Sequence, residues 1–336
     1  MLKAILSGLL GLAAIVAPAF AQSDRAARLQ ETRPSELAAQ PLELIVAYPP
    51  GGGMDIVARQ VARALEQATR QRVIVSNRTG GAGLIGHTWF ATQAPATGQV
   101  VGILSNNFWT DEMLRANGRW SRRDIDPIAF INSDPIAWFV ATSGPFAQRG
   151  LPDVLTHMRA NPGTTRVGAA PGGVSELLAD LVAQSTGSRL LKVPFQGSAP
   201  AITAVLGGNL DIGFSFLADI RGHVDAGTIR PIAFAGTSRI AAMPQVPTFN
   251  EVMSNDRIVI QAWRFVALPK GVPAARRAWL AEAFAVALAD PALRAEFERI
   301  GSAMDPSLDT PERVAAEVAR LSEMERDMLV HFGRLR

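Results

Sequence analysis

A pattern repeated at two distant places limits most strongly what this chain of 336 residues can fold into. Residues 47–75 read AYPPGGGMDIVARQVARALEQATRQRVIV, and residues 168–193 read GAAPGGVSELLADLVAQSTGSRLLKV. Both contain a strand-like run, a Pro-Gly-Gly loop, an amphipathic helix and a second strand-like run. Units of this kind are common, so a coincidence is one explanation. The other is two similar domains, each directing a helix N-terminus at a shared cleft.

Strand-like and helix-like segments alternate along most of the chain, which predicts an α/β fold with mostly parallel sheets. The chain after residue 21 also exceeds the roughly 250–300 residues that one hydrophobic core usually organises, so we expect two domains. The predicted strands are 42–48, 73–76, 100–105, 128–132, 137–142, 166–170, 191–195, 210–215, 229–235 and 263–267. The predicted helices are 55–69, 85–94, 151–159, 175–184, 200–206, 273–289, 291–300 and 311–332.

The N-terminus has the layout of a secretory signal peptide. Lys3 precedes a short apolar run from Ala4 to Val16, and Ala19-Phe20-Ala21 forms an A-x-A cleavage site, so the mature chain is expected to begin at Gln22. The apolar run is shorter than the roughly 20 residues that a membrane span requires. The chain has no cysteine, which excludes a disulfide framework and a thiol nucleophile. These features predict export to a bacterial periplasm.

The charge balance gives little support to a nucleic-acid partner. The formal net charge is only +3, and the basic residues are spread along the chain rather than gathered in a dense run. The doublets at 122–123 and 276–277 are typical of solvated helix faces. We therefore expect no nucleic-acid binding.

The first glycine-rich loop presents bare backbone N–H groups at a helix start, where the helix dipole is positive. A nucleotide-binding P-loop would need a lysine and a hydroxyl after the glycines, whereas Asp55 follows here and would repel a triphosphate. We interpret Asp55 as the helix N-cap. Any ligand then contacts the N–H groups of Gly52, Gly53 and Met54.

A second glycine-rich stretch, TGGAGLIG at residues 79–86, matches G-x-G-x-x-G. A dinucleotide-binding loop would begin at the end of the preceding strand and would have an acidic ribose partner about 20 residues further on. The downstream positions are instead Ser105-Asn106-Asn107. We interpret the stretch, with Gly81, as a loop that lines a cleft or as a simple tight turn.

Residues that could carry out catalysis are scarce. None of the four histidines, 87, 157, 223 and 331, has a partner at metal-ligand spacing, and each is interpreted as a surface or helix-face residue. No G-x-S-x-G motif occurs, so we expect no enzyme, no cofactor and no metal. The remaining cleft candidates follow strands, where ligands of open α/β sheets bind. They are Ser105, Asn106, Asn107 and Ser215, with Phe108, Trp109, Phe195 and Phe216 as either an apolar wall or core.

Several sequence blocks occur in an order that resembles the Bug family, the periplasmic solute receptors of the tripartite tricarboxylate transporter type. The blocks are AYPPGGGMDIVAR, VIVSNRTGGAGLIG, VPFQGSAPAITAVLGGNLDIGF, AGTIRPIAFAGTSRIAAMPQVPTFNEV and VALPKGVPAARRAWL. The resemblance implies a two-lobed Venus-flytrap fold in which each lobe is a Rossmann-like sheet flanked by helices. The implied organisation is a signal peptide at 1–21, an N-terminal tail at 22–40, domain 1 at 41–137 plus 264–336, and domain 2 at 138–263.

The resemblance also implies a small carboxylate ligand, bound by N–H groups of the loops at 50–55 and 169–175. The expected partner is a tripartite membrane transporter or a sensor, and the expected state is a monomer. The alternatives are an exported nucleotide- or NAD-dependent enzyme, or a lobe pair that only contacts other proteins. The candidate ligand-binding residues are Tyr48, Pro50, Gly52, Gly53, Met54, Asp55, Asn77, Gly81, Ser105, Asn106, Ala170, Gly172, Gly173, Val174, Ser175, Phe195 and Ser215.

The sequence departs from the family pattern at three places, and the departures at Val174 and Ser215 affect the expected ligand. Val174 and Leu177 occupy places where relatives have a hydroxyl residue and a histidine, and Thr79 replaces a proline. Ser215 occupies a place that is often acidic, where an acid would pair with a ligand amine. We therefore predict a carboxylate with an apolar or aromatic distal part, and we expect an amino-acid ligand to be disfavoured.

Overall fold

The computed structural model describes residues 24–335 except 237, 255–257, 259, 303 and 332. The predicted signal peptide and its cleavage site lie outside the described residues. Within the described part, no helix is both long enough and apolar enough to cross a membrane.

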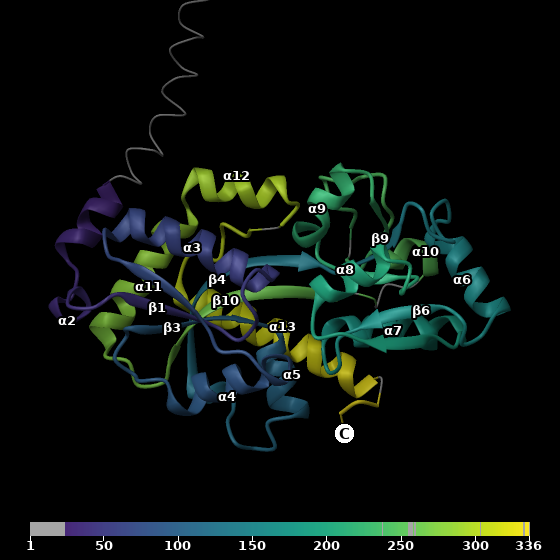
Figure 1. The fold of residues 1–336 in the computed structure, drawn as a ribbon. Helices are drawn as coiled ribbons and strands as arrows, with labels where there is room; N and C mark the ends of the chain where they lie inside the picture. The colour runs from purple at the N-terminus through teal and green to yellow at the C-terminus, as the bar shows by residue number, and fades with distance from the viewer. Residues whose placement is uncertain are drawn as a thin grey trace, which may run out of the picture.

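The molecule has two lobes that lie side by side, as Figure 1 shows. The first lobe contains a five-stranded sheet with the order β2-β1-β3-β10-β4. Its strands are β1 (Leu42–Val46), β2 (Val73–Asn77), β3 (Val100–Ser105), β4 (Ile125–Pro135) and β10 (Gln261–Pro269). Its helices are α2 (Ser35–Ala38), α3 (Gly53–Thr69), α4 (Leu84–Gln93), α5 (Asn107–Leu114), α11 (Ala274–Leu288), α12 (Pro291–Arg299) and α13 (Pro311–His331), with short 3-10 turns η1 (Gly81–Gly83) and η2 (Arg122–Asp124).

The second lobe is built from residues between β4 and β10. It has a three-stranded sheet with the order β8-β5-β9 and a two-stranded sheet of β6 and β7, and a bridge between Val167 and Ile212 links the two. The strands are β5 (Ala137–Ala141), β6 (Arg166–Ala169), β7 (Leu191–Pro194), β8 (Gly213–Ser215) and β9 (Ile229–Phe234). The helices are α6 (Leu151–Ala160), α7 (Val174–Thr186), α8 (Ser198–Leu206), α9 (Leu217–Asp225) and α10 (Phe249–Met253). The predicted two-lobed α/β architecture is confirmed.

The expectation of mostly parallel sheets is wrong for several strands. β1 is parallel to β2 and β3, and β6 is parallel to β7, as β-α-β units require. In contrast, β10 is antiparallel to β3 and β4, and β5 is antiparallel to β8 and β9. The chain leaves the first lobe along β4 and returns along β10, so these two neighbouring strands must run in opposite directions.

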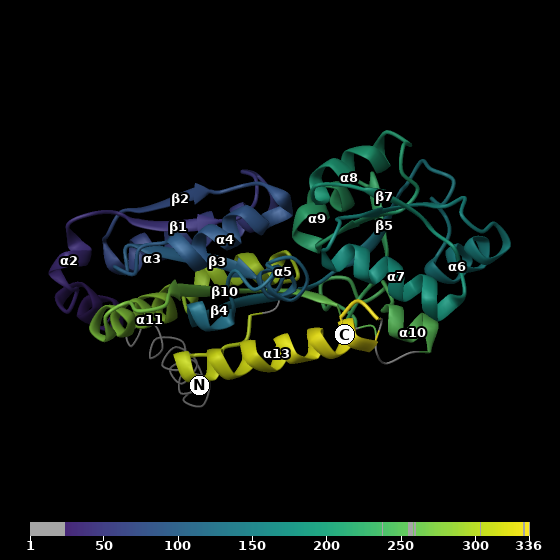
Figure 2. The ribbon, with the colours of Figure 1, turned by 90° about the horizontal axis from the view of Figure 1, so that it is seen from below.

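The hydrophobic core follows the two lobes. One buried cluster draws on residues 136–260 together with Leu329 of α13. Two others lie in the first lobe, one involving α3, α11 and α12 and one involving α4, α5 and α13. This distribution supports domain boundaries near 137 and 263, which remain a proposal. Helix α13 extends from the first lobe to the second, as Figure 2 shows, since Val314 and Val318 pack in the first lobe and Leu329 in the second.

The segment expected to be an N-terminal tail packs against the first lobe over the residues that the structure describes. Residues 24–31 are helical, and Leu29 and Leu37 are buried in the first-lobe core. The Trp279 indole N–H donates to the carbonyl of Leu29 at 2.9 Å. The segment lacks an apolar stripe, so periodicity gives no signal. The buried side chains of Leu29 and Leu37 and polar contacts such as the Arg25–Glu282 ion pair join it to the first lobe.

Gly86 allows α4 to lie directly on β1, because a Cβ there would stand 2.8 Å from the Ala47 Cα and would also meet the Arg78 carbonyl. We expect Gly86→Ala to lower the free energy of unfolding by about 1–3 kcal/mol, the usual cost of overpacking. Gly222→Ala is the control, since Gly222 lies in helix α9 and a Cβ added there would have no atom within 4 Å. Gly222→Ala should raise the free energy of unfolding by about 0.4–1 kcal/mol. Chemical denaturation of both variants tests this, and equal stabilities would contradict the packing argument.

Candidate functional site

A cleft of about 410 Å³ lies between the lobes and is lined by both Pro-Gly-Gly loops. Small-molecule sites commonly have volumes of about 300–1,000 Å³. The first lobe contributes Tyr48, Pro49, Pro50, Gly51, Gly52, Gly53, Met54, Ala82, Asn106, Asn107, Arg115, Ala262 and Arg264. The second contributes Ile136, Ala170, Pro171, Gly172, Gly173, Val174, Ser175, Gln196, Gly197, Ser198, Ala199, Pro200, Phe214, Phe216 and Asp219.

The first loop ends at the N-terminus of α3, where Gly52 is the N-cap and Gly53 the first helical residue. The prediction that Asp55 is the N-cap is wrong, because Asp55 is the third residue of the helix. Its carboxylate reaches back to accept a hydrogen bond from the Gly51 N–H at 2.9 Å. Gly51 has φ of +79°, a left-handed conformation that glycine adopts without strain. No hydrogen bond within the described chain occupies the N–H groups of Gly53 and Met54.

Asp55 supports this loop from behind rather than from inside the cleft. The Arg59 Nε donates to its carboxylate at 2.8 Å, and the Asn77 amide donates to it at 3.0 Å. Asn77 also donates to the Tyr48 carbonyl at 2.9 Å, which ties the end of β2 to the loop. Burial opposes the charge, but the hydrogen bonds from Arg59, Gly51 and Asn77 outweigh it and lower the pKa of Asp55. Asp55 therefore stays ionised and holds the loop in shape.

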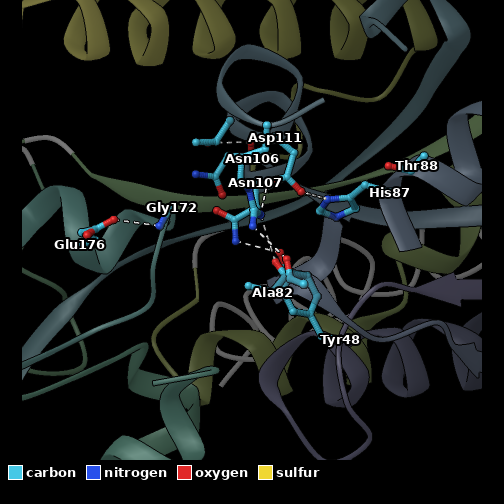
Figure 3. Close-up of polar contacts among 12 residues, drawn as sticks. Tyr48, Ala82, His87, Thr88, Asn106, Asn107, Asp111, Gly172 and Glu176 are labelled. Atoms are coloured by element: carbon cyan, nitrogen blue, oxygen red, sulfur yellow. Dashed lines mark hydrogen bonds and ion pairs between the residues drawn. The ribbon is translucent and has the colours of Figure 1, made fainter. Parts of the chain in front are cut away.

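The second loop repeats the same arrangement at the N-terminus of α7. Gly173 is the N-cap, Val174 is the first helical residue, and Glu176 occupies the third position. The Gly172 N–H donates to the Glu176 carboxylate at 2.8 Å, as Figure 3 shows. Among the described residues, nothing accepts from the backbone N–H groups of Val174 and Ser175. The sequence repeat thus corresponds to two helix starts with the same design, and each presents two free N–H groups.

A buried polar network supports the first-lobe wall of the cleft (Figure 3). The Asn107 amide donates to the Tyr48 hydroxyl at 2.8 Å, and burial raises the pKa of Tyr48 to about 12, so the hydroxyl keeps its proton. Beneath them, His87 Nδ1 lies 2.7 Å from the Asp111 carboxylate, and Arg115 Nε donates to the same carboxylate at 2.6 Å. Of the two interpretations of His87, a surface residue is wrong and a helix-face residue is correct, because His87 lies on α4 and is completely buried.

The end of the cleft nearest the connecting strands holds two ionisable side chains, Asp219 and Arg264. The Asp219 carboxylate on α9 accepts hydrogen bonds from the hydroxyls of Ser198 at 2.7 Å and Ser215 at 2.9 Å. Burial raises the pKa of Asp219 despite these bonds. Arg264 of β10 is 2 % exposed and forms a buried ion pair with Asp134 of β4. This end of the cleft is therefore polar.

Two comparisons of sequence identify the chain. Residues 57–321 match the model of the tripartite tricarboxylate transporter family receptor. The UPF0065 protein in the tcbD-tcbE intergenic region of Pseudomonas sp. (strain P51) is 31% identical over 264 residues, which cover 78% of this chain and 76% of the relative. The chain belongs to the tripartite tricarboxylate transporter receptor family. Protein BugT of Bordetella pertussis is 28% identical over 69% of this receptor and 72% of the relative.

Solved structures agree on the fold. The periplasmic binding protein BugD has a TM-score of 0.80 at 23% identity and covers 88% of this receptor and 98% of its own chain. MatC from Rhodopseudomonas palustris with bound malate has a TM-score of 0.77 at 21% identity and covers 87% of this receptor and 99% of its own chain. Rpa4515 of the same organism with adipate has a TM-score of 0.75 at 24% identity and covers 86% of this receptor and 97% of its own chain. The family is one of solute-binding receptors and not of enzymes, so the alternative of an exported enzyme gains no support.

Most of the candidate residues of this receptor come together in the cleft; that they bind a ligand stays a prediction. Those in the cleft lining are Tyr48, Pro50, Gly52, Gly53, Met54, Asn106, Ala170, Gly172, Gly173, Val174 and Ser175. Six lie outside the lining: Asp55, Asn77, Gly81, Ser105, Phe195 and Ser215. Asp55 and Asn77 brace the loop, and the Gly81 carbonyl accepts from Arg115 at 2.9 Å. Ser105 and Ser215 are buried at strand ends, and Phe195 packs against the second-lobe core.

Three cleft residues, Arg115, Asp219 and Arg264, are not predicted from the sequence, whereas Asn107 lines the cleft as its place after a strand suggests. The helices α5 and α9, which adjoin Arg115 and carry Asp219, are not among the predicted helices. Of the aromatic residues, Phe216 lines the cleft, whereas Phe108 and Trp109 belong to the first-lobe core. The described residues contain no group of three or more His, Cys, Asp or Glu side chains arranged to hold a metal ion.

Proposed function

We propose that this receptor captures a small carboxylate between its lobes in the periplasm, after cleavage of residues 1–21, and presents it as a monomer to a membrane transporter or a sensor. One observation carries the proposal: two helix N-termini, each with two free N–H groups, face a single cleft. Backbone N–H groups at positive helix ends form short, charge-assisted hydrogen bonds to an anion. Closure of the lobes around the anion would remove water and strengthen these bonds.

The composition of the cleft supports a ligand with an apolar or aromatic body. Ile136, Phe214, Phe216 and Val174 give the second lobe an apolar surface beside its glycine loop. Structural neighbours with malate and adipate indicate that this fold accommodates small carboxylates.

Calorimetric titration with matched carboxylates and carboxamides tests the proposal. We expect at least one of benzoate, hexanoate, 4-hydroxybutanoate and 6-hydroxyhexanoate to bind, and we expect its primary amide to bind at least tenfold more weakly, because the amide lacks the negative charge that the N–H groups attract. Absence of binding by all four carboxylates, or equal binding of acid and amide, would contradict the proposal.

Val174→Pro removes one of the proposed donors without removing the helix. Val174 is the first residue of α7, where proline is well tolerated, and Gly173 before it is extended, with ψ of 172°, as a residue preceding proline prefers. Loss of one charge-assisted hydrogen bond of about 1.5–3 kcal/mol should weaken carboxylate binding roughly 10–150-fold. Val174→Ala keeps the N–H and is the matched control. Equal affinities of the two variants, with both melting as wild type does, would argue against this donor.

A further inference from the structure

An acid of the second lobe faces the first glycine loop. Asp219 lies on α9 and lines the cleft, where its carboxyl group accepts hydrogen bonds from the hydroxyls of Ser198 at 2.7 Å and Ser215 at 2.9 Å. Both bonds go to Oδ2, and no hydrogen bond within the described part of the chain reaches Oδ1. Oδ1 is therefore the oxygen that is left for a ligand.

Oδ1 of Asp219 stands beside the proposed anion site. A Cβ atom added to Gly53 would be 2.6 Å from Oδ1 and 3.5 Å from Oδ2. Gly53 is the first residue of α3, and its N–H and that of Met54 are the first-lobe donors that we assign to the ligand carboxylate. A carboxylate bound by these N–H groups is therefore a close neighbour of Oδ1.

Two ionised carboxylates in this arrangement would repel each other. Each would present only acceptor oxygens, and the repulsion is stronger in a desolvated cleft than in water. Arg264 does not supply the missing positive charge, because its guanidinium already pairs with Asp134. A proton on Oδ1 removes the conflict, since the neutral carboxyl group then donates an O–H to the ligand while Oδ2 keeps its two serine donors. Two carboxyl groups that share one site characteristically hold one proton between them.

The surroundings of Asp219 favour its neutral form. Burial in the cleft wall raises the pKa of Asp219, the serine hydrogen bonds and the charge of Arg264 act against it, and the charge of Asp134 adds to it. On α3, the acid after Gly53 is Asp55, which pairs with Arg59 behind the loop. β8 and α8 consist of uncharged residues. The other ionisable residues of α9 are Arg221, His223 and Asp225.

We propose that Asp219 binds the ligand carboxylate as a neutral acid, with Oδ1 donating to a ligand oxygen, so that an ionised receptor takes up one proton from solvent together with its ligand. The proton goes to Oδ1, and no covalent bond forms between receptor and ligand. This inference rests on the proposed function, since it requires a carboxylate at the glycine loops. It adds a side-chain donor from the second lobe to the backbone donors and makes affinity depend on pH.

The sign of this dependence follows from where the proton is held more tightly. The bound receptor retains the proton to a higher pH than the free receptor does, so affinity is greatest at low pH and falls as the pH rises. The probe is the tightest-binding of benzoate, hexanoate, 4-hydroxybutanoate and 6-hydroxyhexanoate. Carboxyl groups titrate near about pH 4, so the probe stays ionised at pH 6 and above.

Calorimetry from pH 6 to pH 9 measures both consequences on wild-type protein. The dissociation constant should rise at least tenfold across this interval. Titrations in MOPS and in Tris, which differ in ionisation enthalpy, should show that binding takes up protons, to a limit of about one per ligand.

Asp219→Asn separates a proton donor from a merely structural side chain. The amide oxygen retains the role of Oδ2 as acceptor from the two serines, and the amide N–H takes the place of the protonated Oδ1 at every pH. This variant should therefore bind the probe with a dissociation constant that changes less than about twofold between pH 6 and pH 9. It should bind more tightly than wild type at pH 9 and take up no proton.

Two controls should retain the wild-type pH dependence. Asp225→Asn removes an acid of the same helix that pairs with Arg221. Glu325→Gln removes the buried acid whose pKa is about 7 and which lines, with Gly172 and Val174, a small cavity of about 20 Å³.

An affinity of wild-type protein that does not change with pH, or an Asp219→Asn dependence equal to that of wild type, would overturn the inference while the observed carboxylate binding left the proposed function intact. Absence of binding by all four carboxylates would refute the proposed function and this inference with it. If Asp219→Asn does not fold, proton uptake by the Glu325→Gln protein decides, because uptake must persist without the other buried acid.

Discussion

Arg264→Met is expected to lower the free energy of unfolding by about 3–5 kcal/mol. Arg264 is 2 % exposed and Asp134 is 5 % exposed, so removal of the guanidinium leaves a buried carboxylate without its cation. The two residues lie on β10 and β4, the antiparallel strands that connect the lobes. The pair therefore stabilises the part of the fold through which the chain passes from one lobe to the other.

Two further variants show whether the loss of stability in Arg264→Met comes from the unpaired buried charge of Asp134 or from the loss of the arginine side chain itself. Lys270→Met breaks the ion pair between Lys270 and Asp126, in which the lysine side chain is 63% exposed. This variant should lower the free energy of unfolding by at most about 1 kcal/mol. Arg264→Met combined with Asp134→Leu removes both charges and should recover most of the loss. Denaturant unfolding measures all three. A loss below 1 kcal/mol for Arg264→Met, or no recovery in the double variant, would contradict this explanation.

Glu325 is expected to make the protein less stable as the pH rises from about 5 to 7. Its side chain on α13 is buried, Oε1 accepts from the Thr110 hydroxyl, and Oε2 has no partner among the residues described. Burial raises the pKa of Glu325 to about 7, although hydrogen bonds from Thr110 and Asn106 act in the opposite direction. The folded state thus retains a proton that the unfolded state loses near its ordinary pKa of 4.5.

Because the folded state binds more protons in this interval, the free energy of unfolding should fall with pH by about 3 kcal/mol in total from this group. Glu325→Gln should remove most of that difference between pH 5 and pH 7. Glu323→Gln, at an exposed position of the same helix, is the control and should keep the wild-type difference. A stability difference that is the same in both variants would exclude Glu325 as its source.

The two-lobed α/β class and the two glycine-rich loops are predictable from the sequence because both depend on local patterns. An apolar strand, a Pro-Gly-Gly turn and a helix with one apolar face are readable within about 25 residues. Both copies of the repeat also have an acidic residue three positions after the helix N-cap, at Asp55 and Glu176. Only the structure shows that these carboxylates accept hydrogen bonds from the loop N–H groups.

The rest of the site depends on contacts that no local pattern encodes. Asp219 is not predicted from the sequence for two reasons. The segment that forms α9 has the pattern of a turn, and a family pattern compares each residue only with residues at its own position. The carboxylate reaches the end of β8 from the next helical turn, which a position-by-position comparison with Ser215 does not reveal. Arg264 reads as an ordinary residue in a strand until β10 pairs with β4 and places it beside Asp134.

In the proposed binding mode, backbone N–H groups from both lobes bind one carboxylate. Backbone ¹H–¹⁵N NMR during titration with the tightest-binding carboxylate of the tested series observes those groups directly. We expect downfield amide-proton shifts at Gly53, Met54, Val174 and Ser175, and we expect all four titration curves to give the dissociation constant that calorimetry measures. Saturation of binding with these four amides unshifted, or with shifts confined to one lobe, would contradict this binding mode.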